Sequence, residues 1–177
     1  MKPRHLIFLV MMWSISACKS DTTNSFGIYL TAEPVAPVIL NRGTNDCSHL
    51  RLESSPVISD ADILSYDFTN HLIRLSQEAA NRITKLATKT NGPAWMPFVA
   101  VADGVPIYLG TFTTIVYDIA YSVPTIDLNR TTNCLIDTVI IQRSWPGASE
   151  SDARPDPRAD ERIRKVLASL HKLKEHE

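Results

Sequence analysis

Apolar positions recur at helical spacing in two parts of the chain. In the first part, apolar residues from Ala79 to Ala87 share one face, and Ser76 is placed as the N-cap. In the second, Asp156 can cap a helix with Pro157 at its first position, and an apolar face continues to Leu170. The pattern predicts helices over about 76–90 and 157–174.

Between and before these helices, the apolar residues follow the two-residue period or short unbroken runs of strands. Extended segments are expected at 26–32, 49–53, 58–66, 72–75, 98–102, 105–109, 124–128 and 138–143. Asp67–Asn70 is expected to form a turn, and Asp103-Gly104 fits a type I′ hairpin turn. Pro106 indicates an edge strand or a bulge near that turn.

The order of these elements favours an α+β fold with a mainly antiparallel sheet and the two helices packed on it. Residues 33–46 are expected to be a loop or an irregular edge segment, and residues 111–121 fit either a strand or a short helix. Because Phe98–Ala102 is strongly apolar, we expect Ile83 and Leu86 to pack against Phe98 and Val101 or the immediate neighbours of these two residues.

The first residues differ from the rest. Lys2 and Arg4 precede an apolar run that is too short to span a bilayer, and small residues follow it. This is the pattern of a secretory signal peptide. Ile15-Ser16-Ala17-Cys18 resembles the lipobox of bacterial lipoproteins, in which the chain is cut before a diacylated cysteine whose amine is usually acylated as well. An ordinary cleaved signal with Cys18 present by chance is the alternative.

The lipobox resemblance implies a signal peptide over 1–17. The polar residues that follow predict a flexible tether over 18–25, and the elements after it predict a single α+β domain over 26–177. The lipobox resemblance also implies a partner, the membrane, held through a lipid on Cys18. Lys19 stands where such lipoproteins carry aspartate for inner-membrane retention, so the outer membrane facing the periplasm is the better expectation. The inner membrane stays open.

The net charge and the cysteine content limit the kinds of partner and bond that the mature chain can form. Removal of residues 1–17 removes Lys2 and Arg4 but no acid, so the net charge changes from −1 to −3. An acidic mature chain argues against a nucleic-acid partner, which needs a basic patch. With Cys18 acylated, Cys47 and Cys134 remain as a pair in an oxidising compartment, and a disulfide between them is expected.

Candidate chemistry is sparse. His49, His71 and His171 are scattered and are expected at the surface, and Asp60 and Asp62 are expected on one solvated face of a strand. No metal site, cofactor or catalytic residue is predicted, because no ligand spacing or nucleophile motif is present. Aromatic residues crowd around the 103–104 hairpin; most should be core, while Trp95 and Tyr117 are candidates for the rim of a binding groove.

The segment from Ile58 to Ile126 resembles the head subdomain of the first periplasmic domain of SecD, a component of bacterial protein export. The matching parts are Leu75 to Ile83 (LSQEAANRI) and Phe98 to Tyr108 (FVAVADGVPIY). The resemblance implies a small exported module that contacts polypeptides, without the membrane helices of a motor. We therefore expect a non-enzymatic envelope lipoprotein that binds a protein or peptide, and the alternative is a cell-envelope enzyme without a recognisable motif.

Overall fold

The structure is a computed structural model, and it describes residues 25–42, 47–88, 95–114, 120–129, 137–146 and 154–174. The signal peptide, the tether up to residue 24, Tyr117 and Cys134 lie outside the described residues. So do residues 91–93 (Asn-Gly-Pro), where the sequence predicts the end of the helix that begins at Ser76, and residues 115–119 of the ambiguous segment 111–121.

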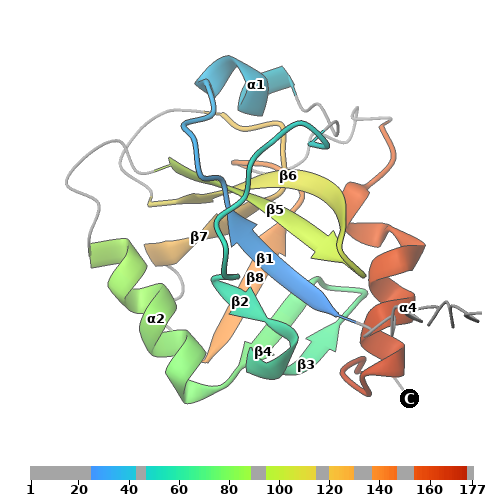
Figure 1. Ribbon diagram of the computed structural model, residues 1–177. Coiled ribbons are helices and arrows are strands. Elements are labelled where there is room, and N and C mark those ends of the chain that lie inside the picture. Colours follow the sequence, from blue (N-terminus) through green and yellow to red (C-terminus); the bar gives the residue numbers. More distant parts are fainter. Residues whose placement is uncertain are drawn as a thin grey trace, which may run out of the picture.

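The described strands form one eight-stranded sheet that is mainly antiparallel, which confirms the predicted α+β class at that level. The strands are β1 (Phe26–Leu30), β2 (Ile58–Ser59), β3 (Ile63–Asp67), β4 (Leu72–Leu75), β5 (Trp95–Ala102), β6 (Val105–Thr113), β7 (Thr125–Asp127) and β8 (Thr138–Gln142). Their order is β2-β1-β5-β6-β7-β8-β4-β3, and only β6 and β7 run parallel. The strands at the two edges of the sheet, β2 and β3, are separated by only three residues along the chain. The two edges must therefore lie near each other, and the sheet curls nearly into a barrel (Figure 1).

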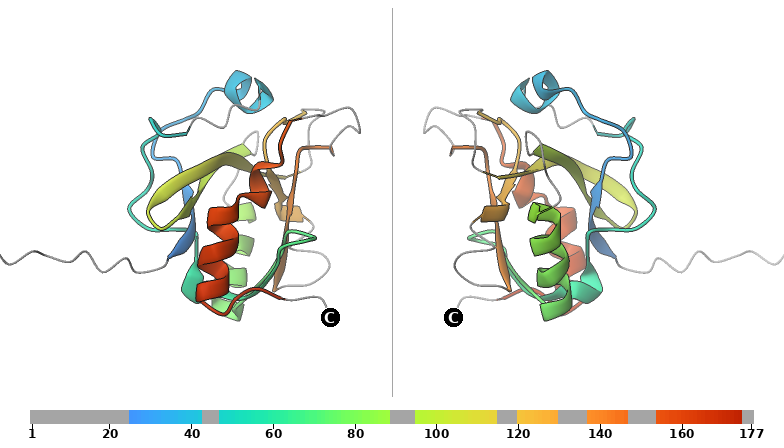
Figure 2. Two further views of the ribbon diagram at one scale, coloured as in Figure 1. Left: turned by 90° about the vertical axis from the view of Figure 1, so that its right-hand side faces the viewer. Right: turned by 90° about the vertical axis from the view of Figure 1, so that its left-hand side faces the viewer.

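The helices are α1 (Pro37–Arg42), α2 (Gln77–Thr88) and α4 (Glu161–Ser169), with single 3₁₀ turns η1 (Asp60–Asp62) and η2 (Pro157–Ala159). Figure 2 shows α2 and α4 on opposite sides of the molecule. The predicted loop over 33–46 was therefore partly wrong: it contains α1, which begins at Pro37, a residue whose fixed φ suits a first helical position.

Strand β5 is apolar on both faces because both faces are covered. Phe98, Ala100 and Ala102 belong to the core enclosed by the curled sheet, which we call the inner core. It also contains Phe26, Tyr108 and residues of α2 and α4. Val99 and Val101 point the other way, into a second cluster with Leu40 of α1 and Val35, which we call the outer core cluster. Ile83 therefore shares a cluster with Phe98, as predicted, and with Ala100 and Ala102, the immediate neighbours of Val101. Val101 itself lies in the other cluster. The two-residue period of a strand is the reason.

The β5–β6 hairpin is confirmed. Asp103 and Gly104 both have positive φ angles, 51° and 73°, as a type I′ turn requires. The pairs Ala100–Tyr108 and Val101–Pro106 leave Ile107 as an extra residue, so the bulge expected near Pro106 is present.

The predicted helix over 157–174 is two elements. Asp156 and Pro157 begin η2 as expected, but Asp160 has an extended backbone (ψ 128°), and its side chain accepts a bond from Arg162 N–H and begins α4. After α4 ends, residues 172–174 run beside β3: Tyr66 N–H donates to Lys172 O (2.7 Å), and Lys174 N–H donates to Tyr66 O (2.9 Å). These bonds cover the edge of β3.

Two expected strands are also different. Of segment 49–53, only Leu52 pairs, in an isolated bridge with Thr31. The segment 58–66 is interrupted by η1, so Asp60 and Asp62 do not share a strand face. Asp62 accepts bonds from Ser59 N–H (2.8 Å) and from Arg82 Nη2 (2.6 Å). Asp62 therefore stabilises the η1 turn and pairs with α2, and it is not the solvated side chain that the sequence predicted.

The burial of α2 predicts unequal effects of two truncations. Ile83 is fully buried, whereas Leu86 is only partly buried against the same core. We expect Ile83→Ala to lower the free energy of unfolding by about 2–5 kcal/mol, and Leu86→Ala by clearly less. Urea unfolding followed by circular dichroism measures both. Equal losses would contradict the packing of α2.

Candidate functional site

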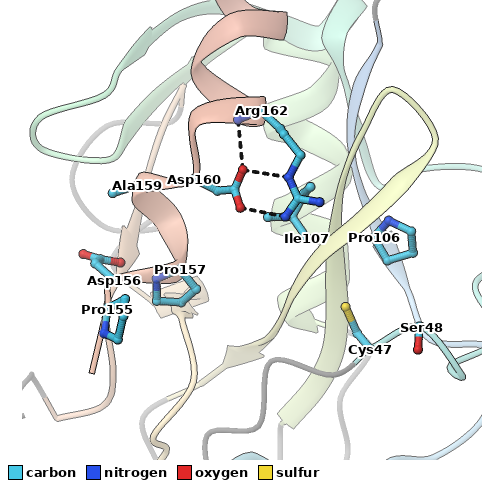
Figure 3. Close-up of a pocket in the computed structure, with 10 residues that line it drawn as sticks. All are labelled: Cys47, Ser48, Pro106, Ile107, Pro155, Asp156, Pro157, Ala159, Asp160 and Arg162. Atoms are coloured by element: carbon cyan, nitrogen blue, oxygen red, sulfur yellow. Dashed lines mark hydrogen bonds and ion pairs between the residues drawn. The ribbon is translucent and has the colours of Figure 1, made fainter. Parts of the chain in front are cut away.

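A pocket of about 590 Å³ opens where η2 and α4 face the β5–β6 hairpin (Figure 3). Its walls come from three separate stretches of the chain. The lining residues are Cys47, Ser48, Pro106, Ile107, Pro155, Asp156, Pro157, Ala159, Asp160 and Arg162. We call this the proline-lined pocket, because three of its lining residues are prolines, whose rings are held rigidly by the backbone.

Capping chemistry positions the acidic residues of the pocket. Asp156 Oδ1 accepts a bond from Arg158 N–H (3.0 Å), and Asp160 Oδ1 accepts one from Arg162 N–H (2.9 Å), so each carboxylate caps one turn. The Arg162 guanidinium folds back onto Asp160, with Nη2 and Oδ2 at 2.7 Å (Figure 3). The charges on this wall are therefore already paired within the protein.

These pairs hold both carboxylates ionised. The hydrogen bonds from Arg162 lower the pKa of Asp160. Burial alone would raise the pKa of Asp156, but its bonds to Arg158 outweigh burial, so that pKa lies below its usual value. Neither carboxylate is suited to act as a general acid near neutral pH, because such a group needs a raised pKa.

Asp156 also belongs to a largely buried polar cluster with Tyr66, His71 and Arg158, and the fully buried Tyr108 lies close to this cluster. The Tyr66 hydroxyl lies 3.3 Å from His71 Nδ1, and His71 Nε2 lies 3.9 Å from Asp156 Oδ2. Arg158 binds Asp156 through Nη2 (2.5 Å) and donates from Nη1 to Ile141 O (2.5 Å). Burial raises the pKa of both tyrosines, so they stay neutral.

His71 corrects a prediction. It was expected at the surface with His49 and His171, which are indeed exposed, but only 6 % of its surface is exposed. Its backbone has a positive φ of 51°, which turns the ring inward against Tyr66 and Phe68. Burial, helped by the nearby Arg158 charge, lowers the pKa of His71 to about 4.

Stability should therefore fall on acidification. The unfolded chain binds a proton at His71 as pH falls below about 6.5, whereas the folded chain does so only near pH 4. Stability from this group is fully present above pH 6.5 and is lost between pH 6.5 and 4, by at most about 3 kcal/mol. Urea unfolding at a series of pH values measures the slope.

His71→Asn should flatten this slope, because asparagine tolerates positive φ but does not titrate. His171→Asn is the matched control: His171 also has positive φ, 55°, but it is exposed, so its replacement should leave the slope unchanged. An unchanged slope in His71→Asn would contradict a neutral, buried His71.

The predicted disulfide remains a prediction. Cys47 is buried in the wall of the proline-lined pocket, and Cys134 lies outside the described residues. We expect peptides containing Cys47 and Cys134 to be linked in the unreduced protein, with reduction lowering stability by about 4 kcal/mol. Mass spectrometry of rapidly acid-quenched periplasmic material tests the link. Two alkylatable thiols would contradict it.

Of the two candidate rim residues, Trp95 lies beside a second, smaller pocket of about 270 Å³. That pocket is lined by Leu30, Thr31, Ala32, Glu33, Pro34, Trp95, Met96 and Pro97. Trp95 also packs against the outer core cluster, so it has a structural role at the same time. Tyr117 lies outside the described residues, so its place at a groove rim stays a prediction.

Sequence reasoning missed the proline-lined pocket. Asp156 and Pro157 were recognised only as a helix start, and the acid- and arginine-rich stretch around them resembled an ordinary surface loop. The run of prolines beside two capping aspartates was the available signal. Within the described ranges, no group of three His, Cys, Asp or Glu residues could hold a metal ion, and no helix is long and apolar enough to cross a bilayer.

Comparison with known proteins adds no relative: no family model, curated protein or solved structure matches the chain significantly.

Proposed function

We propose that the chain is a non-enzymatic lipoprotein of the bacterial cell envelope whose folded domain binds extended polypeptide segments. Cys18 carries the lipid, and the domain faces the periplasm, with the outer membrane favoured over the inner. The sequence Ile15 to Cys18 supports the anchor. The finer fold assignment, two helices packed on a sheet like the SecD head subdomain, belongs to this proposal and rests on Leu75–Ile83 and Phe98–Tyr108.

The proline-lined pocket is the observation that carries the binding function. Its volume of about 590 Å³ falls in the range of ligand sites, and Pro106, Ile107 and Pro157 offer rigid apolar walls to an apolar side chain. The paired charges of Asp160 and Arg162 lie at the pocket, where they can exchange hydrogen bonds with a peptide backbone. Rigid walls bind with little loss of side-chain entropy.

Binding fits these residues better than catalysis. An enzyme would need a reactive group in contact with its substrate, but His71 and Tyr108 do not line the pocket and are enclosed by the core. The lining carboxylates have lowered pKa values and arginine partners. The polar cluster is therefore interpreted as support for the η2–α4 wall.

The test fills the pocket without disturbing the core. Ala159 lines the pocket and is exposed, so Ala159→Trp should occupy the space and leave the fold intact. Ala168→Trp is the matched control, because Ala168 is equally exposed on α4 but does not line the pocket. Binding is measured on arrays of extended peptides rich in apolar residues and proline.

We expect the wild-type protein and Ala168→Trp to bind the same peptides, and Ala159→Trp to bind them at least about tenfold more weakly, a loss of about 1.4 kcal/mol. Peptide binding that survives Ala159→Trp would place the site elsewhere. The absence of any bound peptide would reject a polypeptide ligand.

A further inference from the structure

The chain enters the folded domain beside α4. Ser25 N–H donates to Asp103 Oδ1 (3.1 Å), and Asp103 N–H donates to Ser25 O (2.8 Å), which fixes the start of β1 at the β5–β6 turn. Helix α4 packs against β1 and β5, and Ile163 and Val166 share the inner core with Phe26. The first residues of β1 and the length of α4 therefore lie on the same side of the molecule (Figures 1 and 2).

The solvent side of α4 is basic in an otherwise acidic chain. Ile163, Val166 and Leu167 face the core, which leaves Arg164 and Lys165 exposed on the opposite face. The short segment that follows the helix and runs beside β3 adds Lys172, which is half-buried, and Lys174, which is exposed. We call these four residues, Arg164, Lys165, Lys172 and Lys174, the basic face.

Nearby acids reduce this charge but do not cancel it. Residues 160–177 contain five bases (Arg162, Arg164, Lys165, Lys172 and Lys174) and four acids (Asp160, Glu161, Glu175 and Glu177), a net charge of +1, whereas the whole chain carries −1. Glu161 pairs with Arg164 at 2.5 Å, but both side chains are about half exposed, where such pairs are weak. Asp103, at the β5–β6 turn, is the acid beside the chain entry.

A lipid on Cys18 would keep this face close to the bilayer. Seven peptide units separate Cys18 from Ser25, and each spans at most about 3.6 Å, so the tether reaches no further than about 25 Å whatever its conformation. Helix α4 is about 14 Å long, which is shorter than that reach. The attraction between a basic side chain and an anionic headgroup extends about 8 Å in physiological salt. Only a face of the domain that is turned toward the bilayer therefore adds to membrane binding.

We propose that the basic face of α4 lies on anionic phospholipid headgroups when the protein is anchored through Cys18. This inference rests on the proposed lipid anchor and adds an orientation to it. With α4 against the membrane, α2 on the opposite side faces the periplasm (Figure 2). Juxtamembrane lysine and arginine are the residues that attract anionic lipid surfaces.

The test uses the full-length protein purified from bacterial membranes and placed in vesicles of phosphatidylcholine, with or without a quarter of phosphatidylglycerol. A neutral amine-reactive reagent labels the lysines, and mass spectrometry gives the rate at each one. We expect Lys165 and Lys174 to label at least about threefold more slowly in the anionic vesicles, with the difference removed by high salt. Lys85 on α2 should label equally in both.

Charge reversal provides the variants. In Arg164→Glu with Lys165→Glu, Lys174 should label at the same rate in both vesicles while the protein stays bound through its lipid. Lys85→Glu, an exposed change on α2, should keep the wild-type difference at Lys165 and Lys174.

The possible failures are distinguishable, because the same mass spectra report the N-terminal peptide. An unacylated Cys18 would overturn the anchor and this inference together. Acylated, vesicle-bound protein with equal rates at Lys165 would overturn the orientation alone. Slowed labelling of Lys85 in place of Lys165 would also overturn it, by turning α2 toward the lipid.

Discussion

Cys18→Ala is expected to move the protein completely from the membrane fraction to the soluble periplasm, or to leave it as an unprocessed precursor. The physical reason is that the variant has no thiol to carry the acyl chains; among the described residues, no helix is long and apolar enough to cross a bilayer. Two or three acyl chains give firm attachment, because each buried methylene contributes about 0.8 kcal/mol. Fractionation of cells followed by immunoblotting measures the distribution.

Cys47→Ala is the control for Cys18→Ala. It also removes a cysteine, but from the wall of the proline-lined pocket, so it should leave the protein in the membrane fraction. The basic face of α4 does not compensate for a missing lipid, because surface attraction of this kind is weak and is screened by salt. Membrane retention at high salt of Cys18→Ala protein that has lost its signal peptide would contradict the anchor.

Phe98→Ala is expected to be the most destabilising single truncation of the domain, at about 3–5 kcal/mol. Phe98 is fully buried in the inner core, and its ring lies 4.9 Å from that of Phe112 and 6.4 Å from that of Tyr108. It also covers Gly110 on the paired strand β6, so its loss opens a cavity across two strands. Leu64→Ala, at an exposed position, should change stability by less than about 0.5 kcal/mol.

Gly110 tests the same contact from the other strand. A β-carbon at this position would collide with the Phe98 ring and lie only 2.6 Å from the Pro124 carbonyl oxygen, so Gly110→Ala should cost about 1–3 kcal/mol. In a Phe98→Ala background part of that cost should disappear, because one of the two collisions is gone. Urea unfolding of the four proteins measures the coupling, and fully additive losses would contradict the stacking of Phe98 on Gly110.

Features set by neighbouring residues could be predicted from the sequence. Asp103-Gly104 formed the expected turn because positive φ angles at two successive positions are a property of those residue types. Ser76 capped α2 for a similarly local reason: its Oγ accepts a bond from Ala79 N–H (3.3 Å). The division at Asp160 was missed because Asp156 and Asp160 are equally good caps, and the pattern gave one helix two starting points.

Features that depend on distant segments could not be predicted. His71 belongs to a β-turn, and only the packing of Tyr66 and Asp156 around it makes it a buried group. The proline-lined pocket combines Cys47, Pro106 and Pro157, which no local pattern connects. The burial of Val101 also depends on distant segments: its neighbour Ala100 faces the inner core, but only the curl of the sheet and α1 show that the face of Val101 is buried too.

The mass of the N-terminal peptide of the protein extracted from bacterial membranes tests the central claim most directly. A lipid-anchored envelope protein predicts a peptide that begins at Cys18, lacks residues 1–17 and carries the added mass of two or three acyl chains. A water-soluble protein whose Cys18 still reacts with a thiol reagent would contradict the account.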